Sequence, residues 1–191
     1  MAPPYFKKTP WTPFIHEGCV YDLAHLEEYE FSVIDADATS RRIVVTFSDH
    51  CFTRKPLLQD DPKLIYPGAS RNPGIFCFVR YEHTQRLPEY ITRASNGKVW
   101  NVSEYQENFA VLPTIDHEGK RIFYAVIFSL ERAGKDLPID LHLRVRSAYP
   151  CDKKLPSTFG EIGFTKLVAL TMRRKNVPRI NDPHRKRPRL T

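Results

Sequence analysis

The sequence has little glycine and cysteine: 8 glycines and 4 cysteines among 191 residues. It also has no run of about 18 consecutive apolar residues, which excludes a transmembrane helix. Residues 1–8 carry no apolar stretch after their basic residues, so we expect no secretory signal. Sixteen prolines indicate many stiff connections. We therefore expect a cytoplasmic protein that does not contact a membrane.

The cysteines are Cys19, Cys51, Cys77 and Cys151, and no two have the Cys-x-x-Cys spacing of a metal site. No histidine pair at ligand spacing accompanies them, so a structural zinc site is not expected. Without a secretory signal, the thiols are expected to be reduced. Cys77 lies in the apolar run 75–79 and is expected to be a small buried residue.

Several motifs of enzymes are missing. There is no glycine-rich phosphate loop, no dinucleotide fingerprint, no Gly-x-Ser-x-Gly, no His-Glu-x-x-His and no kinase signature. The pair Asp60-Asp61 has no third carboxylate at useful spacing, which disfavours a two-metal nuclease. We expect no cofactor and no bound metal, and either metal-free chemistry or a binding role.

A composition of 41% hydrophobic and 27% charged residues is typical of one globular domain. Apolar alternation predicts strands at 29–34, 42–47, 75–80, 98–102, 108–112, 121–130 and 140–145. The first two resemble a hairpin. A helical segment is expected at 81–94, restarted at Pro88, and a strand running into a helix at 161–175. This predicts an α+β fold with a twisted, mostly antiparallel sheet of five to seven strands and one or two helices.

We predict three parts: an extended arm at 1–20, a single domain at 21–172 and a basic, disordered tail at 173–191. The formal net charge of +7 arises in the tail, because the other 172 residues carry equal numbers of acidic and basic side chains. A cationic tail without apolar spacing cannot pack a core, but it can bind phosphates. The run 184–189 is also typical of a nuclear import signal. The alternative is a solvated end that only keeps the protein soluble.

Three clusters of polar residues could carry chemistry. The first is the segment 48–54 (SDHCFTR), at the end of an apolar strand. His50 could act there as a general base or acid. Adjacent residues of a strand point to opposite faces, so His50 and Cys51 are not expected to form a nucleophile–base pair. The alternative is that His50 caps a loop and Cys51 is buried.

The second cluster is Arg80-Tyr81-Glu82-His83, at the end of the strand predicted at 75–80. Arg80 could stabilise the charge of a phosphoryl transition state. The alternative is a surface ion pair of Arg80 with Glu82 or Glu89.

The third cluster is the segment 144–150 (RVRSAYP). Arg144 and Arg146 face the same side of a strand by the two-residue period. Two cations on one face repel each other unless an anion lies near, which indicates phosphate. The alternative is a pair of solvated arginines.

A strand that ends in Ser147-Ala148-Tyr149-Pro150 resembles the final-strand motif of the barnase/EndoU/colicin/RelE-like superfamily of metal-independent ribonucleases. That resemblance implies a small α+β domain that cleaves RNA by acid–base chemistry on a sheet face. Many members are toxins, some of them carried by mobile elements. It covers only these four residues; His50 and Arg80 are inferred from their positions.

The leading hypothesis is therefore a metal-independent, toxin-like ribonuclease with RNA as its substrate and an inhibitory protein as a possible partner. His50 would deprotonate the 2′-hydroxyl, and Arg80 and Arg146 would neutralise the phosphate. Ser147 would bind the phosphate, and Tyr149 would position or protonate the leaving group. This scheme requires His50, Arg80 and Ser147 to converge. The basic residues expected to bind nucleic acid are Arg144, Arg173, Arg174, Lys175, Arg185, Lys186, Arg187 and Arg189.

The alternative hypothesis is a non-catalytic nucleic-acid- or protein-binding module. It would bind through the tail and through the N-terminal aromatic residues Tyr5, Phe6, Trp11 and Phe14. Such a module could also be an accessory protein of a mobile element or virus.

Overall fold

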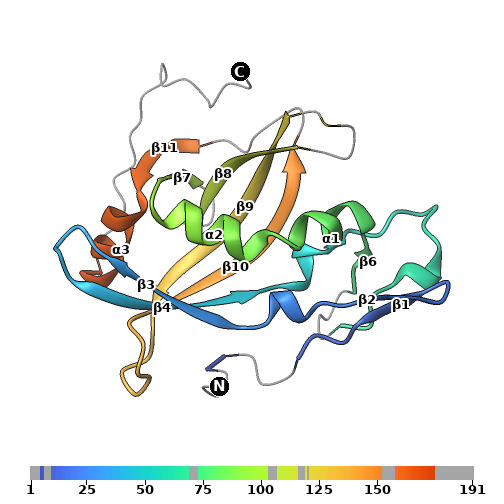
Figure 1. Ribbon diagram of the computed structural model, residues 1–191, viewed down its shortest axis with the longest axis horizontal. Coiled ribbons are helices and arrows are strands. Elements are labelled where there is room, and N and C mark those ends of the chain that lie inside the picture. Colours follow the sequence, from blue (N-terminus) through green and yellow to red (C-terminus); the bar gives the residue numbers. More distant parts are fainter. Residues whose placement is uncertain are drawn as a thin grey trace.

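A computed structural model describes residues 5–6, 10–68, 73–102, 107–115, 119, 121–151 and 158–174. A seven-stranded sheet forms its centre (Figure 1). In spatial order its strands are β11 (Thr158–Gly163), β7 (Lys98–Val102), β8 (Glu107–Ile115), β9 (Arg121–Arg132), β10 (Leu141–Cys151), β4 (Ser40–Phe47) and β3 (Tyr29–Ile34). Neighbouring strands are antiparallel except β10 and β4, which are parallel.

Smaller elements surround this sheet. Two short antiparallel pairs are formed by β1 (Phe14–His16) with β2 (Cys19–Tyr21), and by β5 (Thr53–Arg54) with β6 (Ile75–Phe76). The helices are α1 (Phe78–Thr84), α2 (Leu87–Ser95) and α3 (Phe164–Met172). Single 3₁₀ turns are η1 (Ala24–Leu26), η2 (Asp49–Cys51) and η3 (Pro62–Leu64). The predicted α+β class is confirmed, although the described residues form more strands and one more helix than expected.

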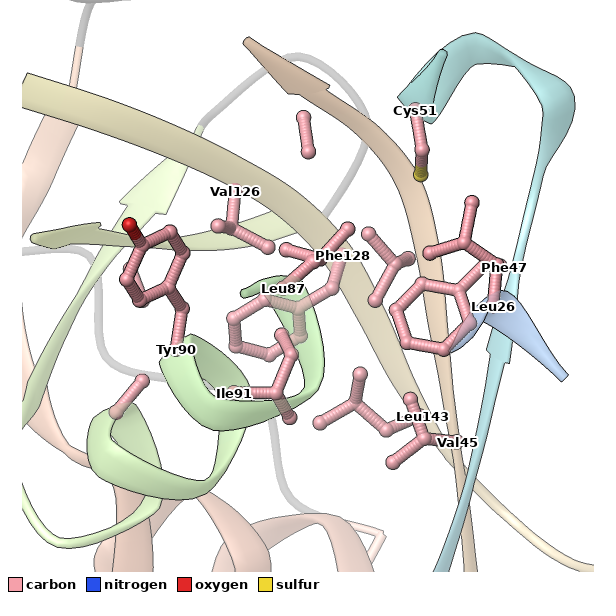
Figure 2. Close-up of a cluster of buried hydrophobic side chains, with 14 of the residues drawn as sticks. Leu26, Val45, Phe47, Cys51, Leu87, Tyr90, Ile91, Val126, Phe128 and Leu143 are labelled. Carbon is pink, nitrogen blue, oxygen red and sulfur yellow. The ribbon is translucent and has the colours of Figure 1, made fainter. Parts of the chain in front are cut away.

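The core lies on the sheet face that α2 covers (Figures 1 and 2). Along β10 the buried residues Leu141, Leu143 and Val145 alternate with the half-buried His142 and the exposed Arg144, as period-two alternation predicts. The helix α2 adds Leu87, Tyr90 and Ile91 to the same cluster. Burying each large apolar side chain contributes about 1.5–3 kcal/mol, so this face supplies most of the driving force for folding.

Most predicted elements agree with the structure. The segments 29–34 and 42–47 pair as the antiparallel strands β3 and β4, and 98–102 is β7. The segments 108–112 and 121–130 lie within β8 and β9, and 140–145 overlaps the start of β10. The strand followed by a helix near the end of the domain is β11 and α3.

The strand predicted at 75–80 is wrong beyond Phe76. Cys77 is the N-cap of α1 and is only half-buried. Phe78 and Tyr81 both contact Phe76, with ring centroids 5.3 and 5.5 Å away. A helix places residues three apart on one face, whereas a strand would place them on opposite faces. The aromatic cluster therefore selects the helix.

The single helical segment predicted at 81–94 is in fact two helices. They are separated at Gln85 and Arg86, and Pro88 lies in the first turn of α2 as expected. Because α1 begins at Phe78, Arg80 lies on a helix rather than at the end of a strand.

The segment predicted as an extended arm contains the β1–β2 hairpin. Glu17 and Gly18 both have positive φ angles, 49° and 79°, which is the type I′ geometry of a two-residue hairpin turn. Before the hairpin, the Trp11 ring packs edge-on against Phe52 at a centroid distance of 5.2 Å. The boundaries of the three predicted parts remain predictions.

None of the helices within the described ranges is long and apolar enough to cross a membrane.

Candidate active site

The turn η2 lies directly on strand β10. It follows β4, whose parallel pairing with β10 is extended by one hydrogen bond from the Ser48 N–H to the Val145 carbonyl, at 2.9 Å. The Ser48 hydroxyl also donates to the Arg146 carbonyl. These two bonds fix η2, and with it His50, beside the middle of β10.

Arg80 ties α1 to the same turn. Its Nη1 donates to the backbone carbonyls of His50, at 2.8 Å, and of Thr53, at 2.7 Å. The Ser147 hydroxyl lies 3.5 Å from the same His50 carbonyl oxygen. The oxygen of His50 is thus contacted from a helix on one side and from β10 on the other.

Tyr149 lies under the guanidinium of Arg80, with the Arg80 carbon Cζ 5.2 Å from the ring centroid. This is the distance of a cation–π contact. Burial raises the pKa of Tyr149 above its ordinary value of 10.0, and the nearby Arg80 charge opposes that rise only in part. The phenol therefore keeps its proton at neutral pH and can donate it.

Strand β10 has a bulge at Arg146. Val145 pairs with Phe128 and Ser147 with Ile127 of β9, so Arg146 is the extra residue. A bulge redirects the side chains around it and is common beside active sites. Arg144 and Arg146 are both exposed, and the buried Val145 lies between them. The expectation that the two arginines lie on one exposed side agrees with this pattern.

The five candidate catalytic residues are linked in one cluster, in which Arg80, Ser147 and Tyr149 take part through their side chains and His50 and Arg146 through their backbone carbonyls. They come from η2, α1 and β10, which are far apart in sequence (Figure 1).

Two details of the sequence analysis need correction. His50 and Cys51 lie in a 3₁₀ turn, so the argument from opposite faces of a strand does not apply. Cys51 is nonetheless fully buried in the core cluster, as the alternative expected, and burial raises the pKa of its thiol to about 12 (Figure 2). The ion pair of Arg80 with Glu89 does not form, because Glu89 pairs with Arg86 and Arg93.

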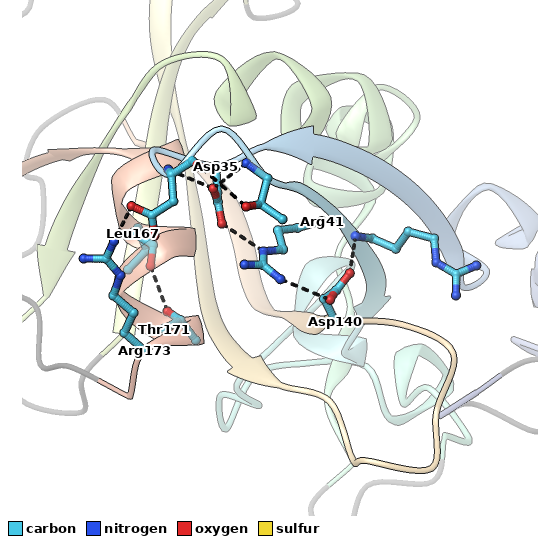
Figure 3. Close-up of polar contacts among 9 residues, drawn as sticks. Asp35, Arg41, Asp140, Leu167, Thr171 and Arg173 are labelled. Carbon is cyan, nitrogen blue, oxygen red and sulfur yellow. Dashed lines mark hydrogen bonds and ion pairs between the residues drawn. The ribbon is translucent and has the colours of Figure 1, made fainter.

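The residues predicted to bind nucleic acid divide into two groups. Arg173 forms an ion pair with Asp37, in the turn between β3 and β4, so this cation is engaged with the fold (Figure 3). Arg174 is exposed and follows the C-cap residue of α3, with a φ of 55°. Lys175, Arg185, Lys186, Arg187 and Arg189 lie outside the described residues.

Three polar groups near the cluster received no predicted role, although two of them, Asp49 and Thr53, lie in the segment 48–54. The carboxyl group of Asp49 lies beside His50, with Oδ1 4.0 Å from Nδ1. The hydroxyl of Tyr124 and that of Thr53 are buried and accept or donate no hydrogen bond among the described residues. Asp49 carried a signal, since it directly precedes His50, but Tyr124 sits in an apolar strand with none. Within the described ranges, no three His, Cys, Asp or Glu side chains are grouped closely enough to hold a metal ion.

The sequence model of the YjaZ family matches residues 13–172. The chain belongs to the YjaZ family. The match to the YjaZ model includes η2, α1 and β10, so the whole cluster lies within it. Residues 173–191, the predicted tail, lie beyond it. Neither a curated protein nor a solved structure matches the chain.

Proposed function

We propose that this protein is a metal-independent, toxin-like ribonuclease whose active site is the cluster on η2, α1 and β10. The observation that carries the proposal is the shared contact at the His50 carbonyl oxygen, where the Arg80 guanidinium and the Ser147 hydroxyl meet. It places the backbone of His50 against a fixed cation and a hydroxyl, and the exposed imidazole of the same residue would supply the base that RNA transesterification also requires.

His50 is the general base in this scheme. Its side chain is 56% exposed, so the imidazole can reach a bound nucleotide. It takes the proton of the 2′-hydroxyl, whose oxygen then attacks the adjacent phosphorus and displaces the 5′-oxygen of the next nucleotide. The products are a 2′,3′-cyclic phosphate and a free 5′-hydroxyl.

Arg80 and Arg146 stabilise the charge that develops on the phosphate. Nη1 of Arg80 is held by two carbonyls, and within the described residues Nη2 and Nε make no hydrogen bond, so they would bind the anion. Two fixed bonds orient the guanidinium before the substrate binds, which is the preorganisation that electrostatic catalysis needs. The exposed Arg146 approaches from the bulge of β10.

Ser147 and Tyr149 complete the site. The Ser147 hydroxyl binds a phosphate oxygen, and Tyr149 protonates or positions the leaving 5′-oxygen. A phenol is protonated at neutral pH, and burial, which raises the pKa of Tyr149 further, makes it a weaker acid, so the positioning role needs testing beside the proton-donor role. The cationic tail raises the local concentration of RNA. A cytoplasmic location and an inhibitory protein that restrains the activity are part of the same proposal.

A second candidate function is a nucleic-acid-binding module without turnover. It is favoured by the same bonds of Arg80, because an arginine that holds two backbone carbonyls already has a structural role. In that case Arg144 and Arg146 bind phosphates along β10.

The experiment uses purified full-length protein, excess EDTA and two oligonucleotides of the same sequence, one of RNA and one fully 2′-O-methylated. We expect cleavage of the RNA alone, with 2′,3′-cyclic phosphate ends, because the methylated strand has no 2′-hydroxyl to attack. Binding of both strands with cleavage of neither would favour the binding module. Cleavage of both would contradict attack by the 2′-oxygen.

A further inference from the structure

The carboxyl group of Asp49 lies beside the candidate site and is largely, but not fully, removed from water, with 12% of the side chain exposed. Asp49 is buried, at 9% exposure, yet neither carboxylate oxygen accepts a hydrogen bond from the described part of the chain. Burying a carboxylate without donors is costly. The other buried aspartate, Asp35, differs: it accepts hydrogen bonds from Arg41 and from two backbone N–H groups (Figure 3).

The groups described around Asp49 do not donate a hydrogen bond to its carboxylate. The hydroxyl of Tyr66 donates to the Thr12 carbonyl, at 2.9 Å, rather than to Asp49. The pKa of Tyr66 is raised to about 12 by burial and by the nearby charge of Asp49. On another side, Oδ2 of Asp49 lies 4.0 Å from the position that a Cβ on Gly68 would occupy, which is an ordinary van der Waals distance. The imidazole of His50 is the partner left, with Nδ1 4.0 Å from Oδ1.

We propose that Asp49 is a positioning residue that binds Nδ1–H of His50 and leaves Nε2 as the free basic nitrogen. A small rotation of the exposed His50 ring shortens the 4.0 Å separation to a hydrogen bond when substrate binds. A neutral imidazole has one donor and one acceptor nitrogen, so fixing Nδ1 as the donor fixes Nε2 as the base. This inference rests on the proposed function for its chemical meaning.

The first test reads the tautomer directly. Full-length protein with ¹⁵N-labelled histidine is studied in a long-range ¹H–¹⁵N correlation spectrum at a pH where the ring is neutral, and a His50→Gln variant assigns the signals. We expect the Nδ1–H form for His50, whereas a free histidine in water favours Nε2–H. A wild-type His50 in the Nε2–H form would overturn the proposal without any variant.

The second test uses Asp49→Asn, with Asp136→Asn on the exposed loop before β10 as the matched control. Asp49→Asn should shift His50 to the Nε2–H form and slow RNA cleavage about 10- to 100-fold, the range for a group that orients a functional imidazole. Asp49→Glu should restore part of both, and the control should change neither. An unchanged tautomer in a folded Asp49→Asn protein would overturn the proposal. If the tautomer shifts but the wild type does not cleave RNA, the pairing stands and the proposed function falls.

Discussion

The side chain of Arg80 has a structural role in holding η2 and a proposed chemical role in stabilising the phosphate. Its Nη1 closes η2 against β5 through the carbonyls of His50 and Thr53, and its charge faces Tyr149. Hydrogen bonds from charged groups contribute about 1.5–3 kcal/mol each to stability.

Replacing Arg80 with methionine should therefore lower the free energy of unfolding by about 2–3 kcal/mol, because two carbonyls lose a charged donor but the exposed bond to His50 can be replaced by water. Urea unfolding measures this. The matched control is Arg86→Met, which removes an exposed pair with Glu89 and should cost less than about 1 kcal/mol. Equal losses in the two variants would mean that the Arg80 contacts add nothing.

Tyr149→Phe tests which of the two roles of Tyr149 is correct. If the phenol protonates the leaving oxygen, cleavage of RNA should slow by about 100-fold or more. A uridine 3′-(p-nitrophenyl phosphate) needs no protonation, because nitrophenolate is a good leaving group, and the variant should cleave it at the wild-type rate. Equal loss on both substrates would instead indicate a positioning role.

At the residue scale, the sequence predicted the members of the cluster but not how they are held. The polar ends of two apolar segments indicated His50 and Arg146, but nothing in the sequence showed that these two segments are neighbours. The contact of Arg80 with the His50 carbonyl is tertiary, between residues 30 apart, so no local pattern contains it. No role was predicted for Asp49 or Tyr124, because the sequence does not show that their side chains are buried.

At the scale of elements, strand β10 belongs to the central sheet and also carries three of the candidate catalytic residues. It pairs in parallel with β4 and antiparallel with β9, and its bulge at Arg146 separates a regular half from a half that faces η2. Period-two alternation predicted the regular half correctly. The bulge depends on which strand lies opposite, and that information is absent from the local sequence.

The regular half of β10 carries His142, which links it to β4. Its Nε2 lies 2.7 Å from the Thr46 hydroxyl, and the Phe6 ring stacks on it at 3.8 Å. Burial lowers the pKa of His142 below 6.5; the charges of Glu131 and Glu28 oppose this change and that of Arg144 adds to it. The fold therefore favours the neutral ring.

Because the unfolded chain binds more protons near pH 6.5, the His142 contribution to stability is complete above that pH and is lost as the pH falls through it. We expect urea midpoints of the wild type to fall between pH 7 and 5, and those of His142→Gln to fall less. His25 has the same sign, since burial also lowers its pKa, so some slope remains in the variant. A variant with the wild-type slope would contradict the assignment.

At the scale of the whole molecule, the folded elements and the excess positive charge lie in different segments of the chain. The seven-stranded sheet and α3 end by residue 172, whereas the excess positive charge is in the segment 173–191. The fold class followed from the sequence, because alternation and charge are local patterns. The order of strands did not, since β4 and β10 pair as parallel neighbours although about a hundred residues separate them in the sequence.

Deleting residues 175–191 removes six basic residues and one acidic residue. RNA affinity should become weaker and less dependent on salt, because each lost phosphate contact removes about 0.7 from the slope of log affinity against log salt for a single strand. The rate of cleavage at saturating RNA should not change. Binding titrations at several salt concentrations decide this, and an unchanged slope would assign the tail no role in RNA binding.

The most direct test of the ribonuclease is the His50→Ala variant. The turn η2 is held through the His50 backbone oxygen, so the substitution keeps both contacts and removes only an exposed imidazole. Cleavage of RNA in excess EDTA should fall at least about 100-fold with an unchanged melting temperature, while His16→Ala, outside the cluster, cleaves like the wild type. Equal cleavage by His50→Ala and the wild type, or none by either, would contradict the account.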